Sequence, residues 1–228
     1  MKDWANSNIL AIDSSGRSLI LGLSFGGDRL VKSSEMVERS HGQIILKKIS
    51  GLFESAGASK DELDGISVCT GPGSFTGLRI GIAAAKGLAV ARGIPVVGIS
   101  LLEIAAHKSC DTDRVVSVLI PLRRDEFIAA DVFQGKPVED KVRVVSTADL
   151  PMLAKDNPVA CYHCRIGDLM SGFAGEDLTA LIEYDGADLI QLGRDRFTAG
   201  LEAELSSLEP LYIQKSQAEI KFDARDKS

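Results

Sequence analysis

Apolar and polar positions alternate in short blocks over the first hundred residues. Apolar runs separated by Ser, Gly and Asp turns predict three strands at residues 8–13, 18–25 and 29–37. Beyond them, the spacing of apolar positions predicts a helix over about 40–55, a helical turn at 59–62, a buried strand at 65–70, a helix at 76–92, a strand at 94–99 and a helix opening at residue 100.

The second half of the chain repeats this order in reduced form. Strands are predicted at 115–120, 126–133 and 141–145, then a short helix from 151, a strand at 158–162, an acidic helix near 177–183 and a helix near 198–208. Three strands followed by β-α-β-α is the order of the ribonuclease H-like, actin-type domain. We therefore expect an α/β fold of two related subdomains, at 1–110 and 111–228, each a mixed sheet flanked by helices. The final segment could pack back on the first subdomain.

Composition narrows the class of protein. The 228 residues are 45% apolar with a net charge of −6, which is typical of a globular protein with a real core. The acidic balance argues against a domain that wraps nucleic acid alone, because phosphate affinity comes from clustered Lys and Arg. Neither a signal peptide nor a membrane-spanning segment is predicted, so we expect a cytoplasmic protein.

Three of the four cysteines, together with one histidine, suggest a metal site that we do not favour. His107, Cys110, Cys161 and Cys164 repeat a ligand-like spacing, so a zinc site can be drawn. Both pairs lie in segments with the pattern of regular structure. We therefore expect no metal, and reduced thiols at these positions and at Cys69.

The strongest local signal is the glycine-rich stretch GPGSFTGLR at residues 71–79, between a buried strand and a helix. It matches neither a Walker loop nor a G-x-G-x-x-G turn. It is either a structural tight turn or a place where backbone amides meet a polar ligand. Asp13, at the end of the first strand, either caps its own turn or lies near phosphate, as in actin-type ATPases. The nucleotide-binding candidates are Asp13, Ser15, Gly71, Gly73 and Ser74.

The helix after this loop carries few charges and many small residues, so we expect it to be covered on more than one side. Its ridge of small residues could face another helix, beside an apolar arc of the preceding helix. The alternative is that both helices are buried within their own domain. The predicted partner interface consists of Ile45, Ile49, Leu52, Phe53, Gly77, Gly81, Ala84, Ala85 and Leu88.

The motif GPGSFTGLRIG at 71–81 resembles the TsaB (YeaZ) family. The segments ILAIDSS, SHGQIILKKI, IPVVGIS and EPLYIQKSQAE resemble the same family in order, whereas residues 143–207 match least. The arginine turn at 121–126, which includes Arg123, departs from the family's usual Asp-Ala-Arg followed by Gly-Glu.

The resemblance implies an actin-like, non-catalytic subunit without a cofactor. Its implied partners are a TsaD-type catalytic subunit, a TsaE-type ATPase, tRNA only through the complex, and a second copy when the protein is alone. The implied product is N6-threonylcarbamoyladenosine at position 37 of tRNAs that read codons beginning with A.

Catalytic TsaD-type relatives carry a His-x-x-x-His metal motif after the strand that resembles IPVVGIS. Leu101 and Ala105 stand at those positions here, and neither side chain can ligate a metal. Two other functions are open: an actin-type small-molecule kinase, which would use Asp13 and the glycine loop, and a metallopeptidase-like enzyme.

Overall fold

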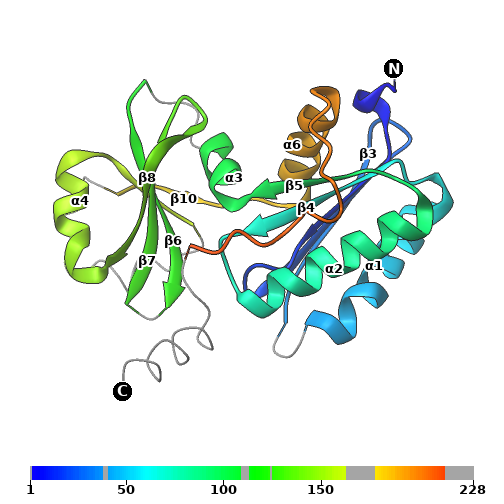
Figure 1. Cartoon of the computed structure of the whole chain (residues 1–228), viewed down its shortest axis with the longest axis horizontal. Helices are drawn as coiled ribbons and strands as arrows, with labels where there is room; N and C mark the ends of the chain where they lie inside the picture. The colour runs from blue at the N-terminus through cyan, green and yellow to red at the C-terminus, as the bar shows by residue number, and fades with distance from the viewer. Residues whose placement is uncertain (1, 38–40, 109–112, 124, 163–177, 214–228) are drawn as a thin grey trace. The chain divides into compact units, whose positions relative to one another are not determined.

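The computed structural model describes all residues except 1, 38–40, 109–112, 124, 163–177 and 214–228 (Figure 1). It divides into two compact units, one made of residues 1–100 and 185–228 and the other of residues 101–184. The boundary that we predicted at residue 110 therefore moves to residue 100. The reason is that helix α3 (Leu101–Lys108) packs on strands of the second unit.

The first unit is a five-stranded mixed sheet with helices on both faces. The strand order is β3-β2-β1-β4-β5, with β2 antiparallel to both neighbours and β1, β4 and β5 parallel. Helices α1 and α2 pack on one face, and α6 packs on the other. The elements are η1 (Trp4–Asn6), β1 (Ile9–Asp13), β2 (Ser18–Phe25), β3 (Arg29–Met36), α1 (His41–Ala56), η2 (Lys60–Glu62), β4 (Gly65–Gly71), α2 (Phe75–Arg92), β5 (Val96–Ser100) and α6 (Gly186–Thr198).

The second unit has the same topology. Its sheet runs β8-β7-β6-β9-β10, with β7 antiparallel to both neighbours and β6, β9 and β10 parallel. The predicted actin-like fold of two related mixed sheets is confirmed. Besides α3, the elements are β6 (Val116–Arg123), β7 (Glu126–Phe133), β8 (Lys136–Ser146), η3 (Thr147–Asp149), α4 (Leu150–Asp156), β9 (Val159–Tyr162) and β10 (Leu178–Ile182).

Two predicted helices are wrong. Residues 178–182 form β10, where apolar and β-branched residues pair in parallel with β9; residue 177 lies outside the described residues. The helix expected near 198–208 does not form. Helix α6 instead precedes this segment and ends at Thr198, and Gly200 takes a positive φ of 68°. The chain continues along β5, where the Ala203 amide donates to the Val96 carbonyl at 2.9 Å.

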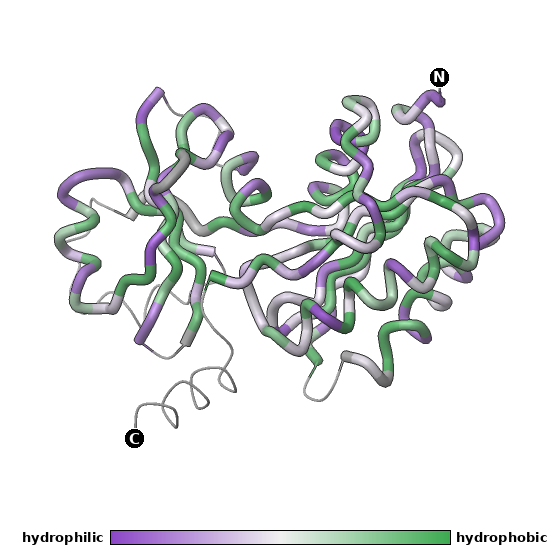
Figure 2. Tube along the Cα trace, viewed as in Figure 1, coloured by the Kyte–Doolittle hydropathy of each residue, from purple (hydrophilic) through white to green (hydrophobic). Residues whose placement is uncertain are grey.

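Helix α6 lies unusually close to the first sheet because small residues face one another. A Cβ atom on Gly186 would be 2.5 Å from the Cα atom of Gly22, and a Cβ on Gly193 would be 2.7 Å from the Cβ of Ser67. The N-terminal cap of α6 is Asp185, whose carboxylate accepts from the Ala187 amide at 2.7 Å. Figure 2 shows hydrophobic residues along the strands of this sheet, so the small residues lie within an apolar layer.

The close contact between Gly22 and Gly186 predicts a large effect of one methyl group. Gly186→Ala should lower the free energy of unfolding by about 2 kcal/mol or more, since backbone atoms cannot move aside cheaply. Urea denaturation followed by circular dichroism measures this.

Gly51→Ala is the matched control, because Gly51 is exposed on α1 and a Cβ there would meet nothing within 4 Å. This substitution should raise stability by about 0.5–1 kcal/mol. Equal stabilities for the two variants would contradict the packing described here.

Candidate functional site

The glycine loop between β4 and α2 is tied to the turn after β1. The Ser74 amide donates to the Ser15 carbonyl at 2.7 Å, and the Ser74 hydroxyl accepts from the Gly77 amide at 3.2 Å as the cap of α2. The hydroxyl of Ser14 donates to the Gly77 carbonyl at 2.7 Å. These bonds hold the start of α2 directly against the β1–β2 turn.

Three positions in this region must be glycine because any side chain there would collide with Ser14 or Ser15. A Cβ on Gly73 would lie 2.6 Å from the Ser15 carbonyl oxygen, and one on Gly77 would lie only 2.0 Å from the Ser14 carbonyl oxygen. A Cβ on Gly81 would lie 2.3 Å from the Ser14 hydroxyl. These contacts favour the structural interpretation of the loop over that of a ligand cradle.

The predicted nucleotide-binding residues come together in space, and three of the five are buried. Asp13 is 1% exposed and its carboxylate accepts from the Ser15 amide at 2.7 Å, which is the turn-capping role. Ser15 and Gly71 are buried, whereas Gly73 is partly exposed and Ser74 is exposed. Burial raises the pKa of the neighbouring Cys69 thiol well above its usual value, and the Asp13 carboxylate adds to the shift. This is a packed polar cluster beneath the loop.

The small-residue ridge that we predicted as an outward surface instead faces the sheet and α1. This prediction is wrong for most of its residues because the glycines make room for the Ser14 turn, not for a partner. Ala84 and Leu88 are half-buried at the edge of the same core. The residues fully inside the first unit are Ile45, Ile49, Leu52, Phe53, Gly77, Gly81 and Ala85.

A different face of the two helices is exposed. Leu46 on α1 is 57% exposed, and Val90 on α2 is 69% exposed. Ala83 and Gly87 on α2 are also exposed, and nothing lies within 4 Å of a Cβ built on Gly87. We call Leu46, Ala83, Gly87 and Val90 the outer helix face. The sequence held this signal, since positions 83, 87 and 90 follow the same helical spacing as the buried ridge.

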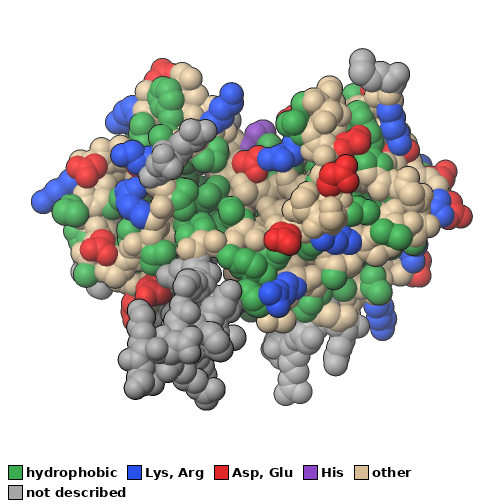
Figure 3. Space-filling view, in the orientation of Figure 1, with side chains coloured by type: hydrophobic (Ala, Val, Ile, Leu, Met, Phe, Trp, Pro, Cys, Tyr) green, Lys and Arg blue, Asp and Glu red, His purple; other side chains and the backbone are tan. Residues whose placement is uncertain are grey.

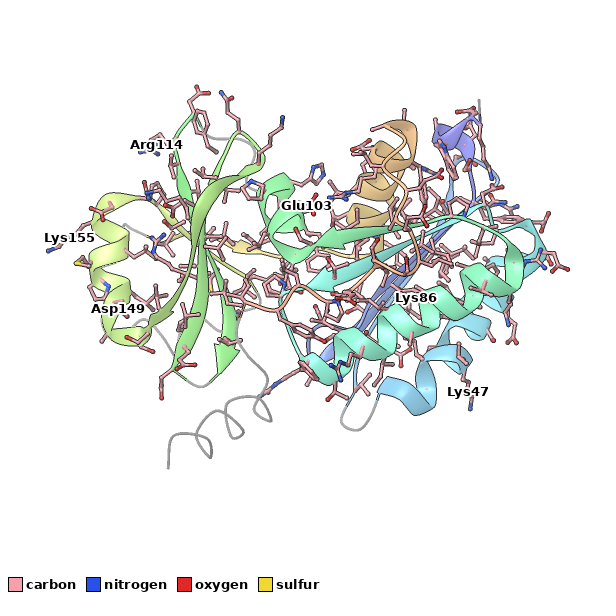
Figure 4. All side chains as sticks on the ribbon, viewed as in Figure 1. Lys47, Lys86, Glu103, Arg114, Asp149 and Lys155 are labelled. Atoms are coloured by element: carbon pink, nitrogen blue, oxygen red, sulfur yellow. The ribbon has the colours of Figure 1, made fainter. Side chains whose placement is uncertain are left out.

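Basic side chains border the outer helix face. Figure 4 labels Lys47 on α1 and Lys86 on α2, and Arg79 lies one turn into α2. Figure 3 shows such blue side chains set among green and tan ones over these helices. No acidic residue occurs in the sequence of α2.

The family model described as TsaD, tRNA N6-adenosine threonylcarbamoyltransferase, matches residues 33–147. A protein of Escherichia coli named tRNA threonylcarbamoyladenosine biosynthesis protein TsaB is 37% identical over 96% of this chain and 99% of its own length. This chain belongs to the TsaB family. The TsaB protein of Bacillus subtilis is 25% identical over 94% of this chain and 97% of its own. The structure of YeaZ from Pseudomonas aeruginosa superposes with a TM-score of 0.71 and 26% identity, covering 91% of this chain and all of that one.

Membership in the TsaB family gives the chain a role in the biosynthesis of threonylcarbamoyladenosine in tRNA. The two positions at which the resemblance described above implies metal ligands in catalytic relatives lie inside the second unit of this TsaB-family chain. Leu101 and Ala105 are 2% and 1% exposed on α3. The described residues include no group of three or more His, Cys, Asp or Glu placed to hold a metal ion. Within the same residues, no helix is long and apolar enough to cross a membrane.

Of the four residues with a zinc-like spacing, Cys110 and Cys164 lie outside the described residues, as does Arg124 of the unusual arginine turn. Cys161 is disulfide-bonded. Our expectation of a reduced thiol is therefore wrong at Cys161. Cys69 is a free, buried cysteine as expected.

The 2.0 Å contact at Gly77 predicts that two glycines of one helix respond oppositely to alanine. Gly77→Ala should lower the free energy of unfolding by about 3 kcal/mol or more, because the Ser14 carbonyl must move. Gly87→Ala should raise it by about 0.5–1 kcal/mol, because the added methyl group meets nothing. Thermal and urea unfolding of both variants test this. A well-folded Gly77→Ala variant of undiminished stability would show that the loop is not closed on the turn.

Proposed function

We propose that this protein is a non-catalytic subunit of the assembly that makes N6-threonylcarbamoyladenosine at position 37 of tRNA. It binds and activates a TsaD-type catalytic subunit, and it meets a TsaE-type ATPase and tRNA only through that complex. The observation that carries this proposal is the pair Leu101 and Ala105, apolar and buried where catalytic relatives have metal-binding histidines. The complex would work in the cytoplasm.

The docking surface in this proposal is the outer helix face. Small residues such as Ala83 and Gly87 allow two helices to approach closely, while Leu46 and Val90 supply apolar area that water otherwise covers. Two helices of this chain against two of a paralogue with the same fold would form a four-helix contact. The same face can pair with itself, so a homodimer would compete with the complex.

The kinase alternative finds little support in the geometry. A phosphoryl-transfer site needs a carboxylate open to metal and phosphate. Here Asp13 is covered, and the glycine loop is bonded to the turn beside it. The metallopeptidase alternative meets the same difficulty at Leu101 and Ala105. Titration calorimetry with Mg-ATP should therefore give no heat of binding to the isolated chain; stoichiometric binding lost in Asp13→Ala would favour the kinase.

An arginine on the outer helix face should block assembly without unfolding the chain. Ala83→Arg places a long charged side chain where the two surfaces would meet, and it should weaken binding at least a hundredfold. The measurement is co-elution with the organism's TsaD-type protein in size-exclusion chromatography, with a melting curve of each variant.

The matched control is Gln191→Arg, which adds the same charge at an exposed position of α6 on the opposite face of the sheet. It should co-elute like the unaltered chain. Failure of the unaltered chain to co-elute at micromolar concentration would refute the scaffold function. Normal binding by Ala83→Arg would refute only the outer helix face as its site.

A further inference from the structure

The segment after α6 crosses to the other side of the first sheet and ends beside α2. We call residues 199–213 the C-terminal strap. Leu208 is 5% exposed and fills the space over Gly98, where a Cβ would be 2.8 Å from its Cδ1 atom. The Leu211 amide then donates to the Thr70 carbonyl at 2.7 Å. Together with the hydrogen bond from Ala203 to Val96, these contacts anchor the strap at three points before it reaches Tyr212.

Tyr212 forms a cluster with two residues of the first turns of α2. Its ring stacks on Phe75 with centroids 4.7 Å apart, and its hydroxyl accepts from Nε of Arg79 at 3.0 Å. The Arg79 guanidinium carbon also lies 3.9 Å from the centroid of the Phe75 ring. One ring face and one hydrogen bond thus fix the direction of an arginine that is itself exposed.

The outer end of this guanidinium remains available. No carboxylate among the described residues lies within salt-bridge distance of Arg79, and its only hydrogen bond there uses Nε. The two terminal nitrogens form a fork that matches the two oxygens of a carboxylate. Because the side chain is already held, little rotamer entropy would be lost on binding.

Resting on the function proposed above, we propose that Arg79 is the charged anchor of the docking surface and that it binds an Asp or Glu side chain of the catalytic subunit. Tyr212 of the strap is the positioning residue that directs the guanidinium. The surface for the partner is then wider than the outer helix face, because it includes the end of a strap that begins on the opposite side of the sheet.

Charge favours an acidic protein surface as the occupant. Helix α2 contains only basic charged residues, at positions 79, 86 and 92, in a chain whose net charge is −6. Arg92 is paired with Asp61, so Arg79 and Lys86 face the partner without such neutralisation. RNA would be repelled by the rest of this acidic chain, and one held arginine does not make a basic patch.

The experiment measures the dissociation constant between the full chain and its TsaD-type protein by titration calorimetry at 0.15 M and 0.5 M NaCl. Arg79→Lys keeps the charge but loses the fork and the ring contact, so binding should weaken roughly tenfold. Tyr212→Phe keeps the stacked ring but removes the acceptor for Nε, so binding should weaken roughly threefold to tenfold. Arg29→Lys, at an exposed arginine of β3 that lies over the Phe25 ring, is the control and should change binding less than about threefold.

A double variant separates positioning from a general structural role. In an Arg79→Gln background, Tyr212→Phe should have no further effect within about twofold, because the hydroxyl acts only through Arg79. The salt dependence of binding should also be smaller in Arg79→Gln than in the unaltered chain. Melting temperatures should stay within a few degrees throughout.

Several outcomes would overturn the proposal. Unchanged binding by Arg79→Lys would do so, as would a Tyr212→Phe effect that persists without Arg79. Normal affinity for the protein partner together with weaker tRNA binding by the assembled complex would assign Arg79 to RNA instead. In each of these cases the scaffold function would stand, whereas absence of binding by the unaltered chain would remove both proposals.

Discussion

The contact between the Ser14 carbonyl and Gly77 determines how the first unit is built. Because Gly77, in the first turn of α2, has no side chain, the helix can lie directly against the β1–β2 turn. That position presses Gly81 and Ala85 onto the sheet and leaves Ala83 exposed. It also closes the loop over Asp13. A single backbone contact thus both packs the loop onto the β1–β2 turn and selects the helix face that remains exposed.

Much of the fold was predictable from the sequence, because strand and helix periodicities differ and the turns are marked by Gly and Ser. The fold class was predicted because the order of elements along the chain, three strands followed by β-α-β-α, is that of the actin-type domain. Helix α6 was missed because Gly186 and Gly193 lower helix propensity, yet these residues are there to let the helix approach Gly22 and Ser67. Local propensity carries no information about such a tertiary contact.

The site was predictable only in part. Periodicity shows that α2 has two small-residue stripes, one through Gly77, Gly81 and Ala85 and another through Ala83 and Gly87, but it does not show which one faces the sheet. Only the position of the Ser14 turn decides this. The cluster of Phe75, Arg79 and Tyr212 has no local signal at all, because it joins residues that are 133 positions apart in the sequence.

A fold that enzymes use does not by itself supply their chemistry, because function depends on the residues of the site. Here Leu101 and Ala105 are core residues and Asp13 caps a turn. Under the proposed non-catalytic function, what the chain offers a partner is a rigid surface. Rigidity has a thermodynamic consequence for binding, since side chains already ordered by packing or stacking lose little entropy in the complex. Arg79 is held in this way between the Phe75 ring and a strap anchored at Thr70.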